Sequence, residues 1–216
     1  MIPKSFHYLF GRDIFLIKMA SPGDAESLHQ SITESIDQLK EFCDWAQLPQ
    51  SVEAQRRRLE ATDSAQQLLS AFQFHIFLNS KIVGSFSLHQ RVIAGALNWE
   101  IGYWIHSQYV GRGIGQLALD ASLWVYTQAL DADIYLMIHP KNIASLKIAD
   151  KNSFVPLGTV IKKSNIDFSE LPLCLFGASK NPHSPLFISH LFTDFDCEKI
   201  PGKIQRWKTN LLEVQF

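Results

Sequence analysis

Residues 98–115 read NWEIGYWIHSQYVGRGIG, and this stretch decides the fold. Over 98–105 the side chains alternate with the period of a strand that presents one face to a core. Glycines follow at 111, 113 and 115, where a helix predicted over 113–130 begins. Glycine lets a backbone approach a ligand closely, and the unpaired amides at a helix start favour an anion. The stretch therefore predicts a strand, a turn that suits a pyrophosphate, and a helix.

Two other glycine-rich nucleotide sites fit this stretch less well. Gly113, Gly115 and Ala118 satisfy the GxGxxA pattern of dinucleotide-binding folds, but no acidic residue closes the next strand, which ends at His139 and Pro140. A nucleoside-triphosphate loop needs Gly-Lys-Ser or Gly-Lys-Thr, which is missing here. Glycines at such a turn also serve tight packing, so the neighbouring sequence has to decide between packing and binding.

The elements around this stretch alternate in type. Upstream, the patterns predict a strand over 13–18, a helix from Ser21 to about Trp45, a helix over 52–70 and a hairpin over 72–88 that turns at Asn79-Ser80. Downstream, they predict strands over 134–138, 154–161 and 171–176 and a helix over 143–151. This order predicts a mixed α/β fold, in which an antiparallel meander leads into strand–helix–strand units and helices pack on both faces of one sheet.

The chain divides into a domain over 1–178 and a C-terminal extension over 179–216. The sequence becomes polar and proline-bearing near Ser179 and then mixes aromatic residues with charges without a clear period. Phe187, Phe195 and Trp207 make the extension too apolar for a free tail. We expect it to pack on the domain or on a second subunit, so a homodimer is one possibility.

Composition excludes several classes of partner. Twenty basic residues against twenty-one acidic ones provide no field that would attract nucleic acid or an anionic membrane. No run of eighteen apolar residues and no signal-peptide pattern is present, and three scattered cysteines lack the spacing of a zinc or redox site. The histidines show no HExxH spacing. The sequence therefore predicts a cytoplasmic protein without a metal.

The block from Asn98 to Phe154 resembles the GNAT acetyltransferase superfamily, and within it the RimJ/RimL-type ribosomal-protein N-terminal acetyltransferases. Residues 100–104 are similar to the family's EIGYW strand, 111–115 to its pyrophosphate loop, and 142–145 to its NxxS helix start. The resemblance covers roughly residues 12 to 177. Two positions depart from the pattern: Val110 replaces a Gln or Arg, and Asn152-Ser153 replaces Leu-Gly.

The resemblance implies an acetyl-CoA-dependent N-acetyltransferase in which an amine attacks the thioester directly. The implied acceptor is a protein or peptide N-terminus, with a polyamine or another small amine as the alternative. The residues that the resemblance places at the cofactor are Trp104, Ile105, His106, Val110, Gly111, Arg112, Gly113, Ile114, Gly115 and Asn142. At the first three of these positions the expected contacts come from the backbone, so His106 is expected at the surface and not as a catalyst.

Two side chains are the catalytic candidates. Glu100 lies beside Gly102 on its strand face and could act as general base, directly or through water; the alternative is a structural glutamate paired with an arginine. The resemblance makes Ser145 the acid for the departing thiolate, whereas a plain helix would use Asn142 and Ser145 as a capping pair. Two rival functions also remain, a non-catalytic acyl-CoA sensor or scaffold and a nucleotide-binding module.

Overall fold

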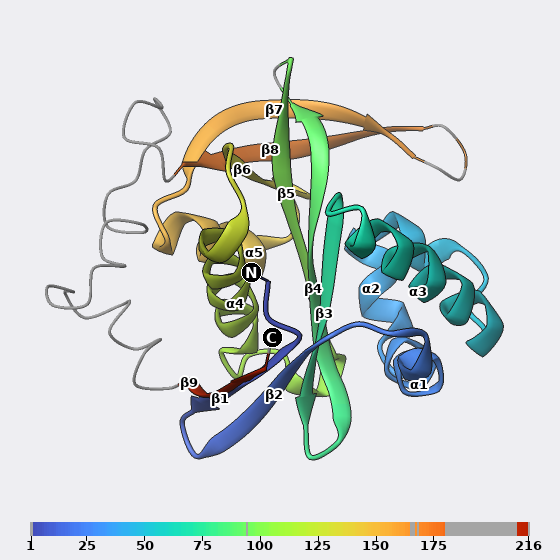
Figure 1. Ribbon diagram of the computed structural model, residues 1–216. Coiled ribbons are helices and arrows are strands. Elements are labelled where there is room, and N and C mark those ends of the chain that lie inside the picture. Colours follow the sequence, from blue (N-terminus) through green and yellow to red (C-terminus); the bar gives the residue numbers. More distant parts are fainter. Residues whose placement is uncertain (1, 94, 165–166, 168, 180–210, 216) are drawn as a thin grey trace, which may run out of the picture.

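The computed structural model describes residues 2–93, 95–164, 167, 169–179 and 211–215, which form one twisted sheet with helices on both faces (Figure 1). The strands are β1 (Ser5–Phe10), β2 (Asp13–Met19), β3 (Ala71–Leu78), β4 (Lys81–Ile93), β5 (Ala96–Ile105), β6 (Ile134–Ile138), β7 (Val155–Lys163), β8 (Glu170–Ala178) and β9 (Leu211–Gln215). The helices are α1 (Ala25–Thr33), α2 (Ile36–Phe42), α3 (Val52–Gln67), α4 (Ile114–Ala129) and α5 (Ile143–Lys151), with short 3-10 turns η1 (Pro22–Asp24), η2 (Asp44–Gln47) and η3 (Ser107–Tyr109).

The sheet is mixed, as the sequence predicted. Its strand order is β7-β8-β6-β5-β4-β3-β2-β1-β9. The β5–β6 pair is parallel, while the other neighbouring strands described here run antiparallel. Asn79 and Ser80 both have positive φ at the turn between β3 and β4, which matches the twist of a tight hairpin. The prediction of a mixed α/β fold that starts as an antiparallel meander is confirmed.

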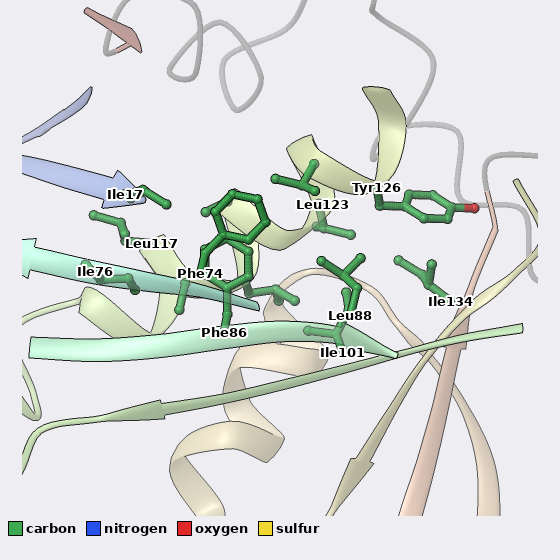
Figure 2. Close-up of a cluster of buried hydrophobic side chains, with 14 of the residues drawn as sticks. Ile17, Phe74, Ile76, Phe86, Leu88, Ile101, Leu117, Leu123, Tyr126 and Ile134 are labelled. Atoms are coloured by element: carbon green, nitrogen blue, oxygen red, sulfur yellow. The ribbon is translucent and has the colours of Figure 1, made fainter. Parts of the chain in front are cut away.

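The larger core lies between the sheet and α4. Residues from alternate positions of the central strands meet the buried side of that helix, and Figure 2 shows Phe74, Phe86 and Ile101 packed beneath Leu117 and Leu123. The rings of Phe74 and Phe86 stack with centroids 5.0 Å apart. A sequence period of two on the strands therefore becomes a single apolar face.

A second core fills the opposite face under α1, α2 and α3. It contains Leu28, Ile32 and Leu59 from the helices and Ile82 from β4, with Trp104 of β5 packed against it. Neighbouring residues of β5 thus belong to different cores, since Tyr103 packs on the α4 side. This alternation decides which side chains of β5 can face which substrate.

At the N-terminus one prediction was wrong and one element was missed. The helix expected from Ser21 to about Trp45 is broken, because α1 ends at Thr33 and α2 starts again at Ile36. Its apolar period continues through the break, which has a tertiary cause described below. The strand β1 was also missed, although buried Phe6 and Tyr8 alternate with more exposed neighbours in it.

The last described segment of the chain, β9, pairs antiparallel with β1 at the edge of the sheet. Residues 180–210 of the predicted extension, including Phe187, Phe195 and Trp207, lie outside the described residues. In the described part of the chain, no helix is long and apolar enough to cross a membrane.

Candidate active site

A gap opens in the sheet between β5 and β6. These strands pair only where Trp99–Ile101 lie beside Ile134–Leu136. Beyond Ile101, β5 continues to Ile105 with its pairing to β4 alone, while β6 continues to Ile138 paired with β8. The two strands therefore diverge, and one edge of β5 is left without a partner strand among the described residues.

The backbone of β5 presents hydrogen-bonding groups to this gap. The His106 amide donates to the Val83 carbonyl across the β4–β5 pair at 2.9 Å. Because hydrogen-bonded and non-hydrogen-bonded pairs alternate along an antiparallel ladder, Trp104 also faces β4, while Tyr103 and Ile105 direct their amides and carbonyls toward the gap. An extended amide-bearing ligand could pair with them as a strand would.

The glycine-rich turn lies at the end of β5 and starts α4. Gly111 and Gly113 have φ of +81° and +82°, which glycine adopts readily. Gly113 is the N-cap and provides no side-chain hydrogen bond, so the first amides of α4 remain available to an anion. Arg112 lies over the Tyr109 ring with its guanidinium carbon 5.1 Å from the centroid.

The two glycines differ in what a side chain would meet. A Cβ at Gly113 would lie 2.8 Å from the Phe10 ring, whereas one at Gly111 would meet nothing within 4 Å. We expect Gly113→Ala to lower the free energy of unfolding by about 2–3 kcal/mol, from backbone strain and overpacking, and Gly111→Ala by about 1 kcal/mol. Chemical denaturation of both variants checks this, and equal losses would contradict it. Gly111 is thus the better position for testing ligand binding.

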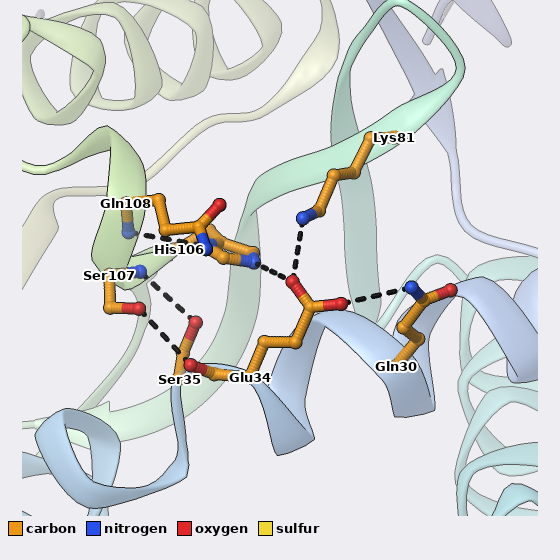
Figure 3. Close-up of polar contacts among 7 residues, drawn as sticks. All are labelled: Gln30, Glu34, Ser35, Lys81, His106, Ser107 and Gln108. Atoms are coloured by element: carbon orange, nitrogen blue, oxygen red, sulfur yellow. Dashed lines mark hydrogen bonds and ion pairs between the residues drawn. The ribbon is translucent and has the colours of Figure 1, made fainter.

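A polar network, shown in Figure 3, joins α1 to the segment between β5 and the glycine turn. Glu34, just after α1, accepts hydrogen bonds from Lys81 at 2.6 Å, Gln30 at 2.9 Å and His106 Nε2 at 3.0 Å. These bonds, with Lys81 contributing most, lower the pKa of Glu34 to about 2. A permanent carboxylate therefore holds His106.

His106 is fully buried, so its expected surface position was wrong. The Gln108 amide donates to His106 Nδ1 at 3.2 Å, which leaves the proton on Nε2 for Glu34. The Ser107 amide donates to Ser35 Oγ at 3.0 Å, and the Ser107 hydroxyl to the Glu34 carbonyl at 3.2 Å. These bonds take Glu34 and Ser35 out of a continuous helix, which explains the break between α1 and α2.

Glu100 lies on the face of β5 opposite α4, with its side chain 18% exposed. Its Oε2 accepts a hydrogen bond from Arg91 Nε at 3.1 Å. His89 of β4 stands directly opposite it, and burial, followed by Arg91, lowers the pKa of that histidine. The structure thus contains the arginine pairing named above as the alternative to a general base, on a carboxylate one residue from the point where β5 and β6 separate.

Asn142 and Ser145 open α5, which begins just after the end of β6. Asn142 Oδ1 accepts the Ser145 amide at 3.1 Å, so Asn142 caps the helix. The Ser145 side chain is half-buried and lies beside Tyr103. The capping contact therefore exists, and it engages only the backbone amide of Ser145, whose hydroxyl interacts with Tyr103.

A scan against protein-family models matches residues 14–155 to the "Acetyltransferase (GNAT) domain". That match covers the helices, the gap, the glycine turn and both catalytic candidates. The chain belongs to the GNAT acetyltransferase family. It is therefore an acyltransferase, and the predicted resemblance is confirmed.

Individual GNAT relatives agree with this assignment. The chain is 28% identical over 129 residues to the ribosomal-protein-serine acetyltransferase of Escherichia coli K12, covering 59% of this chain and 72% of that protein. Its fold matches RimL, a ribosomal L7/L12 alpha-N-protein acetyltransferase in complex with coenzyme A, with a TM-score of 0.68 and 21% identity over 80% of this chain and 97% of that one. The fold also matches Mycobacterium smegmatis RimJ in complex with CoA-disulfide, with a TM-score of 0.72 and 19% identity. This match covers 85% of this chain and 93% of that one. At these identities, the structural matches show the fold alone.

Sequence reasoning missed one contact within this GNAT domain. Asn152, noted above only as a departure from the family pattern, exchanges two hydrogen bonds of 3.0 Å with Gln116 of α4. This clasp ties α4 to the end of α5, and therefore ties the glycine turn to the helix that carries Ser145. The signal in the sequence was Asn152 itself, a polar residue at a position where the family pattern has leucine.

The opposite face brings together residues from distant segments. Trp45 of η2 packs near Trp104 with centroids 6.5 Å apart, and Ser164, just after β7, donates to Asp44 at 2.9 Å. Within the described ranges, no group of three or more His, Cys, Asp or Glu side chains is placed to hold a metal.

Proposed function

We propose that this chain transfers the acetyl group of acetyl-CoA to the primary amine of a protein or peptide N-terminus. The observation that carries the proposal is the gap between β5 and β6, which leads from the glycine turn to the face that bears Glu100. The acyl donor is supported by the family and by the CoA complexes of its structural neighbours. The choice of a protein acceptor is supported by the ribosomal-protein relative.

In the proposed complex, the pyrophosphate lies on the backbone of 110–115, including the amides of Ile114 and Gly115. The pantetheine arm lies in the gap and pairs with the backbone of Ile105. Trp104 and His106 act differently, because their backbones face β4: the Trp104 ring borders the Glu100 face, and His106 fixes the segment before the turn. Arg112, within the glycine turn, contributes a positive charge beside the phosphates, and Asn142 orients the start of α5.

The proposed reaction is a direct attack. The amine nitrogen bonds to the thioester carbonyl carbon, and the carbon–sulfur bond breaks with its electron pair left on sulfur. Glu100 takes the proton that the amine loses, directly or through water, and the Ser145 hydroxyl protonates the sulfur. To act as the base, Glu100 has to give up its hydrogen bond with Arg91 and bind the water or the amine instead. The Arg91 contact therefore supports an alternative, in which the chain binds acyl-CoA without transferring the acyl group.

Calorimetric titration of the full chain tests the donor. We expect acetyl-CoA to bind with a Kd of about 1–100 μM, the range of ordinary enzyme substrates, and NADH and ATP to bind more weakly. Gly111→Val adds a branched side chain that meets nothing within 4 Å but that a φ of +81° disfavours, so it should shift the turn and weaken acetyl-CoA binding. Tighter binding of NADH or ATP than of acetyl-CoA would refute the assignment and favour a nucleotide-binding module.

Amine-dependent release of CoA tests the acceptor. We expect peptides with a free α-amine to release CoA faster than their N-terminally blocked copies and faster than spermidine. Release of CoA with spermidine alone would indicate a polyamine acceptor. The absence of release with every amine would favour a non-catalytic acyl-CoA sensor. A cytoplasmic location and a homodimer stay predictions.

A further inference from the structure

Arg112 carries the only charge in the sequence of the glycine turn, residues 110–115. Val110, which is 50% exposed, stands where the family pattern has Gln or Arg, so the turn starts without the usual polar side chain. None of the ion pairs formed among the described residues includes Arg112. Its guanidinium lies over the Tyr109 ring instead, a contact that holds a cation without neutralising it. An arginine held in this way stays available to a phosphate.

The Tyr109 ring is itself fixed from a second side. It is half-buried and packs against the larger core. It also meets the His106 ring edge-on, with centroids 5.5 Å apart and an interplanar angle of 90°, an arrangement that aromatic rings favour. The Tyr109 amide donates to the His106 carbonyl at 2.8 Å. His106 therefore determines how the ring under Arg112 is oriented.

His106 is held in turn by Glu34, at the end of α1. The imidazole is fully buried, and its Nε2 donates to the Glu34 carboxylate at 3.0 Å. Its other nitrogen accepts a backbone amide, so the ring is bonded at both nitrogens. Figure 3 shows two further donors on the same carboxylate, which restrict its position. A continuous series of contacts thus leads from α1 to the glycine turn, through Glu34, His106, Tyr109 and Arg112.

We propose that Tyr109 and Glu34 are positioning residues for the pyrophosphate of acetyl-CoA. Tyr109 holds the Arg112 guanidinium in place before the donor binds. Glu34 fixes the Tyr109 ring through His106. The inference rests on the proposed function, which places the pyrophosphate on this turn. A free arginine side chain loses rotamer freedom when it binds a phosphate, and holding it beforehand reduces that loss. Because the pantetheine arm separates the pyrophosphate from the thioester, the effect belongs to donor affinity and not to the chemical step.

A double-mutant cycle, with the Kd for CoA measured by calorimetry on the full chain, tests the Tyr109 step. Tyr109→Leu keeps an apolar side chain on the core but removes the ring, so we expect the Kd to rise about fivefold or more. Tyr109→Phe keeps the ring and should stay within about twofold of the wild type. In an Arg112→Met background, Tyr109→Leu should add no further effect, because it acts through Arg112. Equal effects in both backgrounds would refute the positioning role.

A pair of carboxylate variants tests the Glu34 step. Asp24, at the other end of α1, is the matched control, because it also accepts a hydrogen bond from a lysine, Lys18, at 2.5 Å. Its other hydrogen bonds go to Ser21 and not to the segment before the glycine turn. We expect Glu34→Gln to raise the Kd for CoA at least about threefold, because the charge that holds His106 is lost.

Asp24→Asn should leave the Kd for CoA unchanged. It should lower the melting temperature at least as much as Glu34→Gln does, because Asp24 is the more buried carboxylate. Equal rises in Kd from both variants would reflect a general loss of stability and would refute the role of Glu34. A fall in kcat at saturating acetyl-CoA, with the Kd unchanged, would refute the inference as well. If wild-type protein binds no CoA, the proposed function fails together with it.

Discussion

Glu100→Gln lowers kcat by about 10²-fold or more while acetyl-CoA affinity stays within about twofold, if the carboxylate is the general base. Glutamine keeps the shape and can still contact solvent, but it cannot take a proton from the attacking amine. Single-turnover transfer to an α-amino peptide measures the chemical step, and calorimetry measures the affinity. A Glu100→Gln variant with wild-type kcat would remove the residue from the mechanism.

The contact with Arg91 requires a control for this experiment. If Glu100 serves only to hold Arg91, then Arg91→Gln should reproduce every effect of Glu100→Gln. We expect instead that Arg91→Gln keeps kcat within about threefold, because the arginine is more than half exposed and lies outside the proton's path. Equal losses in both variants would make the pair structural and would favour the acyl-CoA sensor.

Local patterns predicted the downstream elements well. The bounds of β6 and α5 match their predicted residues, because Pro140 and Asn142 end one element and start the next within a few residues. The glycine turn was predicted from the same kind of local signal. Its left-handed backbone at Gly111 and Gly113 agrees with the need for glycine there.

Long-range contacts explain what the sequence did not predict. His106 was expected at the surface, yet Glu34, 72 residues earlier, supplies a buried partner and breaks the N-terminal helix in doing so. For Gly113 the sequence left packing and ligand binding open, and it could not name the packing partner, which is Phe10 of the missed strand β1. The gap itself depends on where β6 stops pairing with β5, a register that no local period encodes.

Tyr103 shows a signal that sequence patterns contain but that is easily passed over. Alternation places it in the core together with Trp99 and Ile101. A core tyrosine differs from phenylalanine by one hydroxyl that normally needs a partner. The structure places Ser145 of α5, 42 residues later in the chain, beside this hydroxyl.

The second large effect that we expect concerns stability and pH, and it comes from His75 of β3. Its side chain is fully buried, and Ser85 donates to the Phe74 carbonyl at 2.8 Å while lying 3.2 Å from His75 Nδ1. The Ser85 oxygen must therefore accept the Nδ1 proton, which leaves Nε2 unprotonated and without a partner. Burial, only partly offset by Asp24, lowers the pKa of His75 from 6.5 to about 4.

Because the unfolded chain binds this proton at higher pH than the folded chain, acid favours unfolding. Stability from His75 is complete above about pH 6.5, falls as the pH drops toward about 4, and stops falling below that value, for a total of about 3 kcal/mol. As the pH falls, carboxylates with ordinary pKa values change the stability little before about pH 5 is reached. The loss between pH 7 and 5 is therefore the part that belongs to histidine.

Chemical denaturation across this range, with His75→Asn beside the wild type, isolates the effect. Asparagine can donate to Ser85 through its amide but cannot gain a charge, so we expect a lower stability at pH 7 and a much flatter pH dependence down to pH 5. His89→Asn is the matched control, since the pKa of His89 is also lowered by burial but its ring is less completely enclosed, and it should flatten the curve less. If His75→Asn keeps the wild-type dependence of stability on pH, the protonation of another group drives acid unfolding. In that case the protonated Nε2 of His75 has a hydrogen-bond acceptor in the folded chain.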